Sequence, residues 1–247
     1  MSRRQEMRDK RRRERVRNKV VVIVLVVIGA LLVTFALVWP TIQSEFFATP
    51  ISVISITPQT YNAPVDGTSM GSPSAPVRLD VWEDFQCPAC ANFSLSVMPQ
   101  VIASYVDTGQ VLYTFRFYPF IDNYSNTRES DQAANAAMCA SEQQRFWDYQ
   151  DMLFTNWDGE NDGAFADPRL VRFAEVLELN MDQFNACFDE SRYQADIDRD
   201  FAALEAAGGR GTPFVMVDGV HIVSSAGEQY VPRFEDIAAA IESALQK

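Results

Sequence analysis

The longest uninterrupted run of apolar residues lies near the N-terminus, over residues 20–39 (VVVIVLVVIGALLVTFALVW). The run carries no charge, and Thr34 provides its one polar side chain. A helix of this length spans roughly 30 Å, which is the thickness of the hydrocarbon core of a bilayer. Trp39 suits the membrane interface, and Pro40 marks the end of the helix. The pattern therefore predicts a single transmembrane anchor over residues 20–39.

A cleaved signal peptide is the alternative interpretation of this run. The apolar region of such a peptide is usually about 7–15 residues long and is followed by a small-x-small cleavage site. Here the nearest triplet of that kind, Thr34 to Ala36, lies inside the run. The sequence therefore favours a retained signal-anchor.

The distribution of charge predicts the orientation of the anchor. Residues 1–19 contain ten Lys or Arg and three Asp or Glu, whereas the chain from residue 20 onward has 11 basic and 30 acidic residues. The positive-inside rule places the basic tail, residues 1–19, in the cytoplasm. The acidic body is a poor ligand for nucleic acid, whose phosphates attract basic surfaces. We therefore expect a single-pass protein of the cell membrane with an extracytoplasmic domain, periplasmic or extracellular, whose cysteines meet an oxidising environment.

Beyond the anchor the pattern changes twice. Residues 40–75 contain five prolines and several Ser and Thr without a long period, which predicts a linker. The elements expected after it are a strand from Val77, a helix, a strand over residues 111–120, a helical block over about 125–207, a hairpin turning at Asp218-Gly219 and a closing helix. This order predicts an α/β domain over residues 76–247 with a helical insertion.

The motif Cys87-Pro88-Ala89-Cys90 stands where the first strand gives way to a helix. The unsatisfied N–H groups and the dipole of a helix N-terminus stabilise a thiolate. Pro88 suits the first helical turn, where its missing N–H would have no partner. We therefore expect Cys87 to be an exposed nucleophile of low pKa, and Cys90 to be its buried partner.

Other uses of this motif fit the sequence less well. A zinc site needs two further ligands at suitable spacing, but Cys139, Cys187 and His221 are scattered singly. Covalent haem needs a histidine directly after Cys90, where the chain has Ala91. No metal and no cofactor beyond the Cys pair is expected. A purely structural disulfide stays open as an alternative.

Two further positions accompany the motif. Thr212-Pro213 precedes the hairpin, about 125 residues after the two cysteines. A proline at that place is by itself often only a feature of a strand edge. Together with the Cys motif it becomes a specific signal of function. Asp84, three residues before Cys87, could assist proton transfer, although a solvated carboxylate at the strand end is the favoured interpretation.

Together these residues make the chain from Val77 to Lys247 resemble the DsbA-like branch of the thioredoxin superfamily, in its membrane-anchored or secreted bacterial form. The matching pieces are Asp84-Phe85-Gln86 before the Cys motif, Cys139 and Cys187 in the helical insertion, and Gly211-Thr212-Pro213. The resemblance implies a thioredoxin fold interrupted by a helical domain, with a cis Thr212–Pro213 bond. It also implies that this loop lies against the Cys motif and that the backbone before Pro213 pairs with a substrate chain.

The remaining cysteines allow more than one arrangement. If Cys87 pairs with Cys90, then Cys139 pairs with Cys187 or both stay free. The resemblance implies a structural Cys139–Cys187 disulfide within the insertion, and a secondary redox relay is the alternative.

We therefore expect a membrane-tethered, extracytoplasmic thiol–disulfide oxidoreductase that donates disulfides to reduced exported proteins. Cys87, Cys90, Thr212 and Pro213 form its expected site, and the resemblance implies a quinone-linked membrane oxidase as the partner that regenerates the disulfide. The best-known member of the family has histidine between its cysteines, whereas this chain has Pro-Ala, which suggests a milder oxidant. A client-specific reductase or isomerase, or a non-catalytic binding module with the same fold, stays open.

Overall fold

The computed structural model describes residues 19, 21, 23–39, 51–227 and 231–247, which fall into two compact units, residues 1–51 and 52–247. In the first unit residues 23–39 are helical and their apolar side chains are exposed. Among the described residues, no helix is both long enough and apolar enough to cross a membrane. Residues 20 and 22 of the expected anchor lie outside the described residues, as do residues 1–18 of the basic tail and residues 40–50 of the expected linker.

The second unit is built on a mixed sheet with the strand order β1-β2-β4-β3-β5-β6. The strands are β1 (Val65–Asp66), β2 (Ser69–Met70), β3 (Val77–Glu83), β4 (Val111–Phe117), β5 (Phe214–Val217) and β6 (Val220–His221). β3 runs parallel to β4 and antiparallel to β5. The predicted hairpin turn joins β5 to β6, with Asp218 and Gly219 both at positive φ, as a turn of this kind requires. β3 and β5 thus bring the Cys motif and the Thr212–Pro213 loop to the same end of two neighbouring strands.

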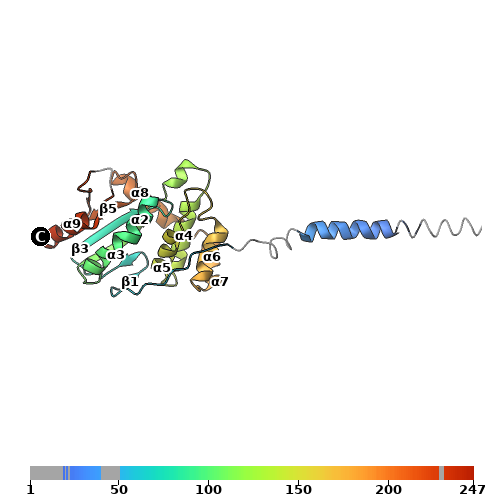
Figure 1. Cartoon of the computed structure of the whole chain (residues 1–247), viewed down its shortest axis with the longest axis horizontal. Helices are drawn as coiled ribbons and strands as arrows, with labels where there is room; N and C mark the ends of the chain where they lie inside the picture. Colours follow the sequence, from blue (N-terminus) through green and yellow to red (C-terminus); the bar gives the residue numbers. More distant parts are fainter. Residues whose placement is uncertain (1–18, 20, 22, 40–50, 228–230) are drawn as a thin grey trace, which may run out of the picture. The chain divides into compact units, whose positions relative to one another are not determined.

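Helices interrupt and follow this sheet. They are α2 (Pro88–Ser96), α3 (Met98–Val101), π-helical η1 (Ile102–Val106), 3₁₀-helical η2 (Ile121–Tyr124), α4 (Glu129–Ser141), α5 (Phe146–Thr155), α6 (Asp167–Val176), α7 (Met181–Asp189), α8 (Gln194–Ala206) and α9 (Phe234–Leu245). Helices α4 to α8 form the insertion between β4 and β5, in agreement with the expected block. In Figure 1, α4 to α7 gather at one end of the domain and α9 lies at the other.

The sheet separates two apolar layers, because successive side chains of a strand point to opposite faces. On one face Leu79 of β3 and Tyr113 of β4 belong to the main core, together with Ile237 of α9. On the other face Trp82 packs with Leu204 of α8. Each layer buries large side chains away from water, which is the main source of stability in a domain of this size. The mixed α/β fold with a helical block is therefore the one that the sequence predicted.

Arg116 connects α8 to the face of the sheet that carries Trp82. Its guanidinium forms ion pairs with Asp80 at 2.7 Å and with Asp200 of α8 at 3.1 Å, and it lies 5.4 Å from the centre of the Trp82 ring. The Trp82 indole N–H donates to the carbonyl oxygen of Asp200 at 3.0 Å. The inserted helices are thus attached to the strand that leads into the Cys motif.

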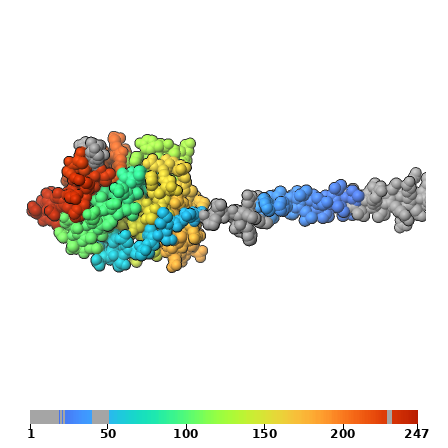
Figure 2. Space-filling model, in the orientation of Figure 1, coloured from blue at the N-terminus to red at the C-terminus, as the bar shows by residue number. Residues whose placement is uncertain are grey.

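Residues 52–75 are part of the domain, so the prediction of a linker extending to residue 75 is wrong. The side chain of Asn156 in the insertion bonds both the N–H of Ile54, at 2.7 Å, and its carbonyl oxygen, at 2.9 Å. Strands β1 and β2 pair with each other, and β2 pairs with β4, where Met70 lies opposite Tyr113 and is fully buried. Figure 2 shows this segment in cyan, running over the surface beside the insertion. A proline-rich composition without a long hydrophobic period is typical both of ordered loops and of flexible tethers, so it did not distinguish between them here.

Candidate active site

Cys87 occupies the N-cap position of α2, with an extended backbone (φ −78°, ψ 118°), and Pro88 follows in the first turn. The N–H of Cys87 donates to the carbonyl oxygen of Asp84 at 3.0 Å, and its own carbonyl oxygen accepts the first helical bond from Ala91 at 3.1 Å. No side chain caps this helix. The free N–H groups of the first turn are therefore directed toward the end where the Cys87 sulfur lies.

The two thiols are free and differ sharply in acidity. A hydrogen bond donated by the Cys90 thiol is the largest influence on Cys87, and it lowers the Cys87 pKa from its ordinary 9.0 to about 6 despite the opposing effect of burial. The backbone N–H groups of Ala89 and Cys90 act in the same direction. Burial, followed by the hydrogen bond to Cys87, raises the pKa of Cys90 well above its ordinary value. Near pH 7 the reduced pair therefore holds one thiolate, on Cys87, and one thiol, on Cys90.

The structure brings the Thr212–Pro213 loop against this pair. The bond between Thr212 and Pro213 is cis. The Cys87 sulfur lies 3.6 Å from the Thr212 carbonyl oxygen, to which it can donate a hydrogen bond when it is protonated. The Thr212 hydroxyl is buried and has no hydrogen-bond partner in the described part of the chain, and its position near the two sulfur atoms lowers the pKa of both cysteines. Only 7% of the Cys87 surface is exposed, so this residue is more covered than the sequence suggested.

Glu83, the last residue of β3, is a member of the site that sequence reasoning missed. Its side chain is 1% exposed, and its two carboxyl oxygens accept hydrogen bonds from the Ser94 hydroxyl at 2.9 and 2.8 Å. Burial raises its pKa well above the ordinary value, and the charge of Cys87 adds to the effect. Glu83 in turn raises the pKa of Cys90. A buried carboxyl group close to a buried thiol can exchange a proton with it.

Asp84 is buried, so the prediction of a solvated carboxylate is wrong. Its Oδ1 accepts from the N–H of Gln86 at 2.8 Å and from the Ser130 hydroxyl at 2.6 Å, and its Oδ2 accepts from the N–H of Ile121 at 3.0 Å. Burial raises its pKa to about 7, although these hydrogen bonds oppose the shift. Asp84 fixes the turn that joins β3 to the Cys motif, and its contacts place it in a positioning role.

Gln86 is held by the insertion immediately before Cys87. Its side chain is fully buried, with Nε2 donating to Asp122, Ser130 and Asn161, and Oε1 accepting from the N–H of Asn161 at 2.6 Å. The indole N–H of Trp157 donates to the Gln86 carbonyl oxygen at 2.6 Å. Segments that are remote in sequence therefore fix the backbone on which the Cys87 sulfur stands.

A groove of about 540 Å³ opens beside the Thr212–Pro213 loop. The residues that line it are 210–214, 221–223, 231 and 232. The ring of His221, the one histidine of the chain, stacks on Phe214 with centroids 3.9 Å apart. Val223, Val231 and the Phe214 ring give the groove apolar walls, and Arg210 adds a cation. This mixture suits an extended peptide with apolar side chains.

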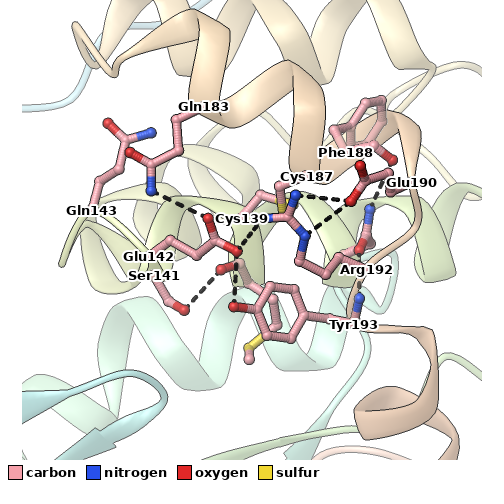
Figure 3. The surroundings of a disulfide bond; sticks show 12 residues. Cys139, Ser141, Glu142, Gln143, Gln183, Cys187, Phe188, Glu190, Arg192 and Tyr193 are labelled. Atoms are coloured by element: carbon pink, nitrogen blue, oxygen red, sulfur yellow. Dashed lines mark hydrogen bonds and ion pairs between the residues drawn. A yellow bond between two sulfur atoms is a disulfide. The ribbon is translucent and has the colours of Figure 1, made fainter.

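Cys139 of α4 and Cys187 of α7 form a disulfide bond, with their Cα atoms 5.7 Å apart. Both side chains are fully buried. Figure 3 shows Glu142 beside this bond, where it accepts hydrogen bonds from Gln183 at 3.2 Å, Arg192 at 2.8 Å and Tyr193 at 3.1 Å. The bond and its polar surroundings join α4 to α7 and to the chain that leads into α8. Among the described residues, no group of three His, Cys, Asp or Glu side chains has the arrangement of a metal site.

Comparison with known proteins agrees with this geometry. A family model described as thioredoxin matches residues 64–242. The probable disulfide bond formation protein D of Bacillus anthracis is 24% identical over 181 residues, which cover 72% of this chain and 78% of that protein. Oxidised BdbD from Bacillus subtilis has a TM-score of 0.62 at 20% identity, covering 79% of this chain and 100% of its own. Alpha-DsbA1 from Wolbachia pipientis has a TM-score of 0.60 at 23% identity, covering 76% of this chain and 96% of its own. The chain therefore belongs to the thioredoxin family, as a DsbA-like thiol–disulfide oxidoreductase.

Proposed function

We propose that this protein introduces disulfide bonds into exported proteins by thiol–disulfide exchange at Cys87 and Cys90. The observation that carries the proposal is the asymmetry of the pair, in which a thiolate of low pKa at a helix N-terminus stands next to a buried thiol of raised pKa. Stabilising the Cys87 thiolate stabilises the reduced form, and a stable reduced form makes the disulfide a better oxidant.

The exchange proceeds in two steps. A substrate thiolate attacks the Cys87 sulfur of the Cys87–Cys90 disulfide, so a mixed disulfide forms and Cys90 leaves with the electron pair of the broken bond. Cys90 then takes a proton, for which the neutral carboxyl group of Glu83 is a suitable source. A second substrate thiolate attacks the substrate sulfur of the mixed disulfide, which closes the substrate disulfide and releases Cys87 as a thiolate. The substrate loses two electrons and two protons; the enzyme keeps both electrons and one proton, and the other proton goes to solvent.

The groove beside the Thr212–Pro213 loop is the proposed place for the substrate chain. The Cys87 sulfur lies against the Thr212 carbonyl oxygen, so a peptide paired with the backbone at Thr212 has its own cysteine next to Cys87. The apolar walls of the groove favour unfolded segments, whose apolar side chains are still exposed. Thr212 and Pro213 are thus proposed as positioning residues of the site.

We also propose the cellular setting that the sequence predicts. Residues 20–39 anchor the chain in the cell membrane, the basic tail lies in the cytoplasm, and the domain lies outside. A membrane oxidase accepts the two electrons from the reduced pair and regenerates the disulfide. The support is the uncharged run of twenty residues and the change from a basic tail to an acidic body. Full-length protein should resist alkaline extraction from membranes, whereas a chain lacking residues 1–39 should be released; release of both would contradict the anchor.

The reduction potential of the Cys87–Cys90 pair tests the proposed direction of electron flow. The full-length protein in detergent is equilibrated with glutathione buffers, and Cys139 and Cys187 are followed separately by mass. A potential above about −200 mV is expected of a disulfide donor. A potential near about −270 mV would place the protein with thioredoxin-like reductants and overturn the proposal. A Cys87 that resists alkylation near neutral pH after mild reduction would instead indicate a non-catalytic binding module.

A further inference from the structure

A second cavity, of about 160 Å³, lies on the side of α2 that faces α5 and the segment before β1. Its lining includes Tyr113 of β4 and Trp147 of α5, both of which are buried. The Tyr113 hydroxyl oxygen and the Trp147 indole nitrogen have no hydrogen-bond partner in the described part of the chain. Buried polar groups of this kind are normally satisfied by water when the space is polar and roomy enough, and this volume has room for several molecules.

The cavity is one hydrogen bond away from Glu83. Ser94 and Gln150 both line it. The Ser94 hydroxyl contacts both carboxyl oxygens of Glu83, and the Gln150 side chain donates to the Ser94 oxygen at 3.2 Å. A hydroxyl group both accepts and donates, so Ser94 can pass a proton between the cavity and Glu83. Glu83 itself is 1% exposed and has no direct route to bulk water.

Asp151 of α5 lines the same cavity and is partly exposed. No hydrogen bond or ion pair to its carboxylate is found among the described residues. The titratable groups around the cavity are Tyr61 from the segment before β1, Glu83 from β3, Asp107 at the end of η1, Tyr113 from β4 and Asp148 from α5. No Lys or Arg is among the described residues that line the cavity. Burial, and then the charge of Asp148, raises the pKa of Asp151 to about 7.

We propose that this cavity is the path by which protons pass between Glu83 and solvent during disulfide exchange, with Asp151 as the relay group at its mouth. The inference rests on the proposed function, because that function requires Cys90 to gain and lose a proton. When Cys90 leaves as a thiolate it takes the proton of Glu83, and the Glu83 carboxylate is then reprotonated from solvent through Asp151, cavity water and Ser94. When the Cys87–Cys90 bond forms again, Glu83 first loses its proton to solvent by the same route, and its carboxylate then accepts the proton of Cys90.

The test compares Asp151→Asn with Asp182→Asn, which removes one exposed carboxylate on α7, away from the cavity. The rate at which a small dithiol reduces the Cys87–Cys90 disulfide is measured in the full-length protein from about pH 5.5 to 8.5. Each variant is expressed as a ratio to wild type at the same pH, which removes the titration of the dithiol itself. The rate in Asp151→Asn should fall by about tenfold or more, since positioned acids and bases contribute about 10²–10⁴. The Asp182→Asn ratio should stay near one.

Two further measurements separate a proton relay from a structural role. The Asp151→Asn ratio should change with pH around 7, where wild-type Asp151 titrates, and a small exogenous acid such as formate should restore part of the rate. Ser94→Ala removes the hydroxyl group between the cavity and Glu83. It should lower the reduction rate by a similar factor, and formate should not restore that rate. Equal rates and pH profiles in wild type and Asp151→Asn would overturn the relay. The rate of dithiol reduction depends on the proton relay whether the protein works as a donor or as a reductant. A low reduction potential would contradict the proposed donor function and would leave this test of the relay unaffected.

Discussion

The donated hydrogen bond from Cys90 is expected to control the reactivity of Cys87, and Cys90→Ala removes that donor alone. A hydrogen bond to a charged group contributes about 1.5–3 kcal/mol, which corresponds to about one or two pKa units. The Cys87 pKa should therefore rise from about 6 to between about 7 and 8. At pH 7 the thiolate fraction then falls from about 90% to between about half and a tenth.

The assay is the rate of alkylation of Cys87 as a function of pH, with the ultraviolet absorbance of the thiolate as a second readout. The matched control is Cys90→Ser, because a hydroxyl group in the same place still donates and should keep the pKa near 6. Alkylation at pH 7 should thus be about two- to tenfold slower in Cys90→Ala than in Cys90→Ser. If both variants titrate near 6, the helix N-terminus and Thr212 account for the low pKa, and the hydrogen bond from Cys90 does not.

The same shift has a consequence for the pH dependence of the wild-type protein. The folded-state pKa lies below the ordinary 9.0, so the Cys87 thiolate stabilises the reduced protein fully above about pH 9, and this gain is lost as the pH falls through about 6. At pH 7 the gain is about 1.4 kcal/mol, which is equivalent to about 30 mV for a two-electron couple.

Three further changes test the structural roles of other residues. Cys139→Ala combined with Cys187→Ala should lower the free energy of unfolding by about 4 kcal/mol, because the bond closes a loop with a sequence separation of 48. Glu83→Gln should flatten the decline in stability of the reduced protein as the pH rises above 4.5, because the folded state keeps a proton on Glu83 that the unfolded chain loses there. Asp84→Ala should lower the free energy of unfolding by roughly 3 kcal/mol or more, because three buried donors lose their acceptor.

Urea unfolding measures all three, and each has its own contradicting result. For the double cysteine variant, that result is a wild-type midpoint under non-reducing conditions. For Glu83→Gln, it is a pH slope identical to that of wild type. For Asp84→Ala, it is an unchanged midpoint, which would mean that water replaces the carboxylate without loss.

The sequence predicted the parts of this protein that carry local signals. The strands around Val77 and Val111, the hairpin turn at Asp218 and the helix that starts at Cys87 each follow from a periodicity or a turn residue. Glu83 was within reach of the same reasoning. The alternation in VRLDVWE places Glu83 on the face of Leu79 and Val81, so a buried carboxyl group directly before the Cys motif could have been predicted from the sequence.

Other parts depend on tertiary contacts that have no local signal. The Gln86 backbone is fixed by Trp157 and Asn161, which lie about seventy residues later and show no pattern relating them to the motif. The strands β1 and β2 have two residues each, which is too short for any periodicity to appear. The same limit explains why residues 52–75 were assigned to a linker. A segment that lies against a folded domain needs few apolar residues of its own.

The shortness of those strands has a consequence for how the domain meets other chains. Both edge strands of the sheet, β1 and β6, are two residues long and exposed, so each edge offers few unpaired backbone groups. A long, exposed edge strand can pair with a strand of another chain, which leads to aggregation. Unfolded chains, which are the proposed substrates, are rich in segments able to form strands. The short edge strands therefore protect this protein from aggregating with its substrates. Contact is instead directed to the groove beside Pro213, from which a substrate can be released.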